Sequence, residues 1–111
     1  MLIDKKDSHI IITPEDNCDQ RFFINLKNKI HDFSKEHLII DFSKLDTIAL
    51  DDVLQFFDIA LEKRKQNTSF IIVATDITID DIPDEINVVP TLNEAQDVLE
   101  MDAMERDLMG L

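Results

Sequence analysis

The spacing of hydrophobic residues near the start of the chain predicts a β-hairpin followed by a helix. Two apolar stretches, Leu2 to Asp4 and Ser8 to Thr13, flank a polar segment, a pattern typical of paired strands. From about Cys18 to Phe33, apolar side chains recur every third or fourth position, which indicates one buried helix face, and Asp16 and Asp19 suit its N-terminus. That face comprises Phe22, Leu26, Ile30 and Phe33.

Two later runs predict central strands. The runs His37 to Phe42 and Ser69 to Ala74 are too short for helices, and they are apolar on both faces, as in strands covered by helices on both sides. Between them, apolar residues from Val53 to Leu61 have helical spacing, and the basic residues 63–65 suit the end of a helix. The resulting strand-helix-strand unit is expected to be parallel and right-handed.

The last third of the chain predicts one short strand and a final helix. Residues 75–87 contain five acids and no base, which indicates an exposed connection with a short helical turn near Asp80. After a minimal strand at residues 88–89, Thr91-Leu-Asn-Glu94 forms a capping box that begins a helix. The residues on its inward face are Leu92, Ala95 and Leu99.

This final helix can run on through Met101, Met104 and Leu108. We therefore divide the chain into a domain of residues 1–100 and a C-terminal helical extension or tail of residues 101–111. The apolar stripe of the extension can dock a partner or a second copy of the chain, or pack back on its own domain.

These elements predict a single α/β domain, with a mixed, mostly parallel sheet of about four or five strands packed against about three or four helices. A chain of 111 residues has the usual size of one domain. No apolar run approaches the roughly 20 residues of a membrane span. The charged start, Met1 to Lys6, lacks the apolar core of an export signal. We therefore expect a cytoplasmic protein.

The formal charge of −13 changes the expectation about partners. Nucleic acids and anionic membranes are bound through Lys and Arg, so neither is expected as a partner. The acidity is concentrated in the second half, since residues 66–111 hold 11 acids and one base. A protein partner with a basic patch is therefore expected, and its binding should weaken with salt.

The sequence lacks the patterns of an active site. The three histidines are isolated on separate predicted elements and form no zinc motif, and the only cysteine, Cys18, can form no internal disulfide. The only glycine, Gly110, is too near the end for a phosphate-cradling loop. No serine lies in a nucleophile-elbow sequence, and the acidic loop lacks the spacing of an EF-hand. We therefore expect no catalysis, no metal and no cofactor. The residues considered are His9, His31, His37, Ser8, Ser34, Ser43, Ser69, Asp80, Asp81, Asp84 and Glu85.

Two segments carry a likeness to a known family. Residues 38–54 read Leu-Ile-Ile-Asp-Phe-Ser-Lys-Leu-Asp-Thr-Ile-Ala-Leu-Asp-Asp-Val-Leu, and residues 90–95 read Pro-Thr-Leu-Asn-Glu-Ala. The first resembles the strand, loop and helix start of the STAS family, the fold of anti-sigma-factor antagonists, and the second is similar to the way that family's last helix opens. The likeness covers roughly residues 8–100. It implies a bacterial, non-catalytic regulator that acts through protein-protein contacts.

The resemblance also implies a site. Aligned without gaps, the family's Asp-Ser-Ser-Gly falls on residues 49–52, so Asp51 stands at the position of the family's phosphorylated serine. Asp51 has no hydroxyl to phosphorylate, and it carries about one charge where phosphate carries about 1.5 to 2. In the simpler interpretation, Asp51 and Asp52 only cap the helix. The partner-binding residues that we expect are Asp46, Thr47, Asp51, Asp52, Leu54 and Gln55.

Three other functions compete with this interpretation. Some STAS-like domains hold small molecules, and a ligand sensor needs a pocket with convergent polar groups. The ending of residues 104–108, Met-Glu-Arg-Asp-Leu, resembles that of short chains associated with ribonuclease Z. The chain lacks the ligands of that zinc enzyme, so this likeness would make it an accessory protein to an RNA-processing nuclease. An acidic decoy of nucleic acid would need acids along one face, which the helical pattern supports poorly.

Overall fold

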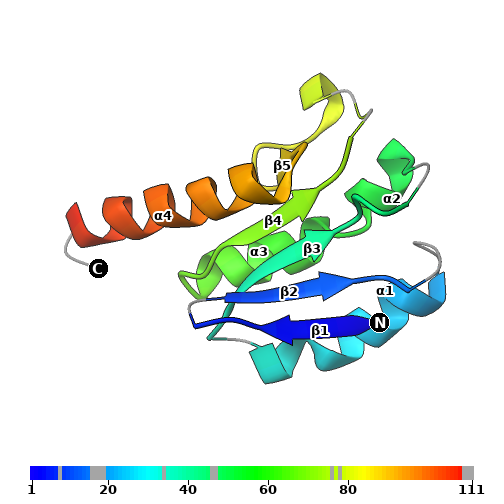
Figure 1. Cartoon of the computed structure of the whole chain (residues 1–111), viewed down its shortest axis with the longest axis horizontal. Coiled ribbons are helices and arrows are strands. Elements are labelled where there is room, and N and C mark those ends of the chain that lie inside the picture. The colour runs from blue at the N-terminus through cyan, green and yellow to red at the C-terminus, as the bar shows by residue number, and fades with distance from the viewer. Residues whose placement is uncertain are drawn as a thin grey trace.

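A computed structural model describes residues 1–7, 9–15, 20–33, 35–45, 48–75, 77 and 79–108. They form a five-stranded sheet with the order β1-β2-β3-β4-β5, so strands adjacent in the sequence are adjacent in the sheet (Figure 1). β1 (Leu2–Lys5) pairs antiparallel with β2 (His9–Thr13). The parallel part continues through β3 (His37–Asp41), β4 (Phe70–Val73) and β5 (Asn87–Val89). The predicted α/β fold with a mixed, mostly parallel sheet is confirmed.

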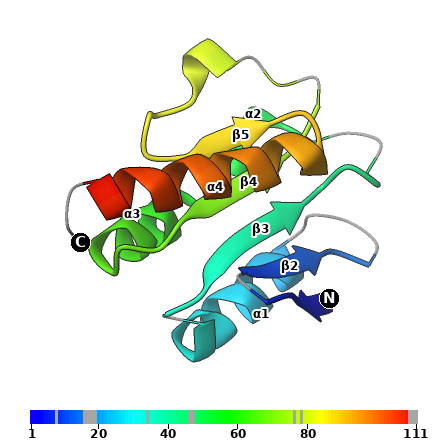
Figure 2. The same ribbon diagram turned by 60° about the vertical axis from the view of Figure 1, so that its left-hand side comes forward.

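The helices form a layer on each face of the sheet. On one face lie α1 (Gln20–Lys29), the 3₁₀ turn η1 (Ile30–Phe33), α2 (Leu50–Leu54) and α3 (Phe57–Lys65). α4 (Leu92–Leu108) lies across the other face (Figure 2). A second 3₁₀ turn, η2 (Ile79–Asp81), confirms the helical turn expected near Asp80. None of the helices in the described part of the chain is long and apolar enough to cross a membrane.

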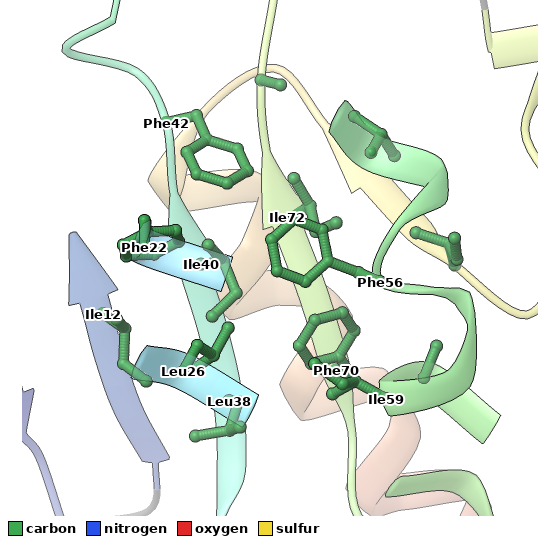
Figure 3. Close-up of a cluster of buried hydrophobic side chains, with 14 of the residues drawn as sticks. Ile12, Phe22, Leu26, Leu38, Ile40, Phe42, Phe56, Ile59, Phe70 and Ile72 are labelled. Atoms are coloured by element: carbon green, nitrogen blue, oxygen red, sulfur yellow. The ribbon is translucent and has the colours of Figure 1, made fainter. Parts of the chain in front are cut away.

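The larger core lies between the sheet and the layer of α1, α2 and α3. Strand residues Ile12, Ile40 and Ile72 are fully buried there. Successive rings of Phe42, Phe56 and Phe70 pack with centroids 5.9 and 6.1 Å apart (Figure 3). Three residues of the predicted helix stripe are buried in this core and the fourth is partly buried against it; they are Phe22, Leu26, Phe33 and Ile30. The spacing therefore identified the correct face of α1.

A smaller core holds α4 on the opposite face. Ile39 and Ile71 from the two central strands pack with Ala95 and Leu99 of α4, and Leu92 is partly buried beside them. The predicted inward face of the last helix is therefore confirmed. The two central strands are buried on both sides, which explains why their sequences show no alternation of polar and apolar residues.

The second predicted helix is interrupted at Gln55 and Phe56, which separate α2 from α3. The Phe56 N–H donates to the carbonyl of Val53 at 3.0 Å, a bond across three residues that tightens the turn there. The Phe56 side chain is completely buried between the rings of Phe42 and Phe70. The chain thus departs from a continuous helix where a large aromatic side chain enters the core.

α3 ends in a motif that the sequence pattern did not reveal. Asn67 has a left-handed backbone with φ of 59°. Its N–H donates to the Arg64 carbonyl at 3.1 Å, and the Thr68 N–H donates to the Lys63 carbonyl at 3.0 Å. These two bonds form a Schellman motif, which satisfies carbonyl groups that a helix end leaves open.

Lys63, one of the basic residues that suit the end of this helix, is buried. Only 1% of the side chain is exposed, and its ammonium group donates hydrogen bonds to the carbonyls of Phe33, at 2.7 Å, and Glu36. Burial lowers the pKa of Lys63 to about 8, and the negative charge of Glu36 opposes this shift. The side chain therefore ties α3 to the segment between η1 and β3.

α4 begins where the capping pattern predicts and continues across position 100 without interruption. The Thr91 hydroxyl oxygen accepts a bond from the Glu94 N–H at 3.2 Å, which is the hydroxyl half of the predicted capping box. Further along, the Ser69 hydroxyl donates to the Asp102 carboxylate at 2.7 Å. This bond attaches the second half of α4 to the start of β4. The predicted first helix can be followed only from Gln20, because Asp16, Cys18 and Asp19 lie outside the described residues.

Candidate partner-binding surface around Asp51

The expected partner-binding residues follow the carboxyl end of β3. Buried Asp41, the last residue of this strand, accepts a hydrogen bond from the Ser43 N–H at 2.9 Å, which turns the chain out of the sheet. In parallel α/β sheets, binding sites lie outside the carboxyl ends of the strands. Asp46 and Thr47 lie outside the described residues. The surface is therefore built from residues 48–55, which contain α2.

Asp52 has a structural role at the start of α2. Its carboxylate accepts a hydrogen bond from the Ala49 N–H at 3.1 Å. Ala49, at the N-cap position, has no side-chain oxygen to return the bond, so this is one half of a capping box. The helix-capping interpretation is correct for Asp52.

Asp51 differs from its neighbour. Its side chain is exposed in the first turn of α2 and makes no hydrogen bond or ion pair with any described residue. Its negative charge still suits the positive end of the helix dipole, an effect of about 0.3–1 kcal/mol at an exposed position. Among the described residues, no hydrogen bond or ion pair therefore engages this carboxylate.

Leu54 and Gln55 border the same surface. Both side chains are half-buried, whereas Val53 and Phe56 on either side of them are buried in the core. The exposed parts of Leu54 and Gln55 can offer an apolar contact and an amide beside the Asp51 carboxylate. The surface therefore combines one exposed charge with a half-buried apolar side chain, an arrangement suited to protein contact.

A serine, a histidine and an aspartate do come together, but not as a catalytic triad. The Ser69 hydroxyl donates to Asp102, while the His37 Nδ1 accepts from the Ser69 backbone N–H at 2.9 Å. In a triad the imidazole must accept the hydroxyl proton, and the carboxylate must hold the imidazole. Ser69 is buried as well. These contacts hold α4 and β3 to the start of β4. Of the other candidate serines, Ser43 is exposed, and Ser8 and Ser34 lie outside the described residues.

The expectation that the histidines are isolated is wrong for two of them. His9 and His37 are paired in register at the starts of β2 and β3 and line one hollow, whereas His31 is exposed in η1. Burial lowers the pKa of His9, the positive charge of Lys6 lowers it further, and Asp4 opposes them. A signal was present in the sequence, since each histidine directly precedes a run of three branched apolar residues. Parallel strands in register bring such equivalent positions together.

Two hollows flank α4. One is lined by His9, His37, Gln96, Leu99, Glu100 and Ala103 and has a volume of about 480 Å³. Its lining combines apolar and polar side chains, as the alternative function of a small-ligand sensor requires. The other lies between α3, β5 and α4, and its lining includes Arg64 and the acids Asp84, Glu85, Asp102 and Glu105. Across the described ranges, no group of three or more His, Cys, Asp or Glu side chains could hold a metal ion, and this includes the acids near η2.

No model of a protein family matches the sequence. No curated protein matches it either. The STAS resemblance therefore rests on the two segments of this chain that carry it.

Proposed function

We propose that this chain is a cytoplasmic, non-catalytic module that binds another protein through the surface around Asp51. The observation that carries the proposal is the exposed Asp51 carboxylate, which has no hydrogen bond or ion pair with the described residues while Asp52 supplies the cap. An exposed charge that no other described residue pairs with is available to a partner. The STAS resemblance supports the same position, because it aligns Asp51 with the serine through which that family regulates binding.

The chemistry of the surface favours a partner with a basic patch. Arg or Lys on the partner can pair with the Asp51 carboxylate, and Leu54 and Gln55 supply contacts beside that ion pair. The net charge of −13 draws a positive surface toward the chain before contact is made. Salt screens both effects, so the affinity falls as ionic strength rises.

Because Asp51 has no hydroxyl to phosphorylate, phosphorylation at this position cannot switch the binding surface on or off. A kinase can add a phosphate to serine and a phosphatase can remove it, but neither reaction applies to the Asp51 carboxylate. We infer that binding at this surface is constitutive and is regulated by the amount of either protein.

The test compares the wild-type chain with Asp51→Ala in affinity capture from a lysate of the source cells, followed by binding measurements on the purified partner. We expect Asp51→Ala to weaken binding about tenfold, or about 1.4 kcal/mol, the scale of a charge-assisted contact. Its stability should change by no more than about 0.5 kcal/mol, because the side chain is exposed and makes no hydrogen bond or ion pair with the described residues.

Two control variants separate binding from folding. Asp58→Ala removes another exposed acid from the first turn of α3 and should bind as wild type does. Asp52→Ala removes the cap and should lower the free energy of unfolding by about 0.5–2 kcal/mol. Equal binding by wild type and Asp51→Ala would remove Asp51 from the site. Recovery of no specific protein by the wild-type chain would reject the binding function itself.

A further inference from the structure

The outer face of α4 exposes two methionines. Met101 and Met104 are 61% and 64% exposed, and their spacing places them on the same side of the helix. Ala95 and Leu99 of the same helix are buried against the sheet, and Asp102 accepts the hydrogen bond from Ser69. Because these contacts anchor the opposite side of α4, the two methionines point away from the domain.

This pair of side chains is suited to binding. A single exposed apolar residue is ordinary. Two methionines that are neighbours on a helix surface form a flexible, polarizable patch of the kind used to bind protein segments. The C-terminal end of α4 reaches beyond the starts of the strands (Figure 1). A partner can therefore approach this part of the helix without meeting the sheet.

Carboxylates surround the methionines. Asp97 and Glu105 lie one turn before and one turn after Met101, Glu100 lies one turn before Met104, and all three acids are exposed. No base occurs between residues 66 and 105. The outer face of α4 thus has an apolar centre and an acidic border. We call these five residues the methionine face.

We propose that the methionine face docks an amphipathic helix of a partner protein that carries Lys or Arg on both sides of an apolar stripe. The apolar stripe would cover Met101 and Met104, and the basic residues would pair with the bordering carboxylates. A second copy of this chain fits poorly, because it would bring two acidic borders together. α4 and α2 lie on opposite faces of the sheet, so this surface is separate from the one around Asp51.

The chain has four methionines, which makes methyl NMR a direct test. The full chain, labelled with ¹³C at the methionine methyl groups, is titrated with a synthetic 18-residue amphipathic helix of Leu and Lys. We expect the Met101 and Met104 signals to shift together, while that of Met1, which packs partly buried against the larger core, stays in place. Replacing both Met101 and Met104 by Ser should weaken binding at least tenfold, or about 1.4 kcal/mol.

The controls separate apolar docking from simple charge attraction. The double Met→Ser variant keeps every charge, so unchanged binding would show attraction by charge alone and would overturn the proposal. A peptide of Leu and Glu with the same apolar pattern should not bind. Self-association of the chain that disappears in the double variant, measured by sedimentation, would identify a second copy as the occupant and would also overturn it. Asp51→Ala should leave the titration unchanged, so this test does not depend on the proposed function.

Discussion

Neighbouring acidic residues in this chain have different roles because their surroundings differ. Asp52 accepts a backbone hydrogen bond and caps α2, whereas Asp51 is exposed and has no hydrogen bond or ion pair with the described residues. The same contrast separates Lys63 from Lys65 at the end of α3. Lys63 is buried and bonded to two carbonyls of another segment, and Lys65 is exposed. Residue type alone therefore does not assign a role at either place.

Lys63 gives a pH-dependent prediction. Its folded pKa of about 8 lies below the ordinary 10.5, so between these values the unfolded chain holds more protons on this side chain than the folded chain does. Unfolding free energy therefore rises with pH in this window, by up to about 3 kcal/mol for a shift of this size. Below pH 8 the cost of burying the charge is present in full.

The measurement is urea unfolding followed by far-ultraviolet circular dichroism at pH 7.5 and pH 10. The unfolding free energy of wild type minus that of Lys63→Met should be larger at pH 10 than at pH 7.5, because only the wild-type chain has the titrating group. Lys65→Met, which removes an exposed lysine from the same helix, should show no such growth. If this difference in unfolding free energy were equal at both pH values, the result would contradict the altered pKa of Lys63.

At the scale of the elements, local signals and tertiary contacts decide helix ends together. Thr91 caps α4 as its sequence predicts, but α3 stops at the left-handed Asn67, and α2 stops where Phe56 turns into the core. Asn is the residue that most readily replaces Gly in a left-handed position, so the end of α3 had a local signal. The break before α3 had none, because apolar spacing continues through it.

The Schellman motif at Asn67 predicts a clear order among three variants. Asn67→Ala should lower the free energy of unfolding by about 1 kcal/mol, because a β-carbon is disfavoured at a φ of 59°. Asn67→Gly should equal or exceed wild type, since glycine adopts this backbone freely. Thermal unfolding of the three proteins under the same conditions checks the order. An alanine variant as stable as the glycine variant would show that the left-handed backbone is unimportant.

At the scale of the whole molecule, one sheet separates two different surfaces. The α1, α2 and α3 layer covers the larger core, while α4 covers the other face (Figure 2). Asp51 is exposed on the first layer, and the methionine face is exposed on α4. The charge is also unevenly divided, with a net −10 in residues 66–111. The two proposed binding surfaces therefore lie on opposite sides of the sheet, and the negative charge of the chain would favour basic partners at both.

The net negative charge predicts that added salt stabilises the folded chain. Repulsion among like charges destabilises a compact state, and added salt screens it. Raising NaCl from 10 mM to 0.5 M should therefore raise the urea midpoint of the wild-type chain. The Asp97→Asn, Glu100→Gln double variant should be more stable at low salt, by up to about 0.5 kcal/mol per substitution, and should gain less from salt. A midpoint that falls with added NaCl would contradict the argument.

The sequence by itself determined the α/β class, the order of the elements, the buried faces of α1 and α4, and the charge that favours a basic partner. Each follows from spacing, capping or composition, which act over a few residues or over the whole chain. Only the tertiary structure decided which acid at α2 is exposed, that Lys63 is buried, and that Ser69 binds Asp102. Except at α2, these outcomes depend on contacts between residues about 30 positions apart in the sequence. Such contacts form only when the chain packs, so no local sequence pattern predicts them.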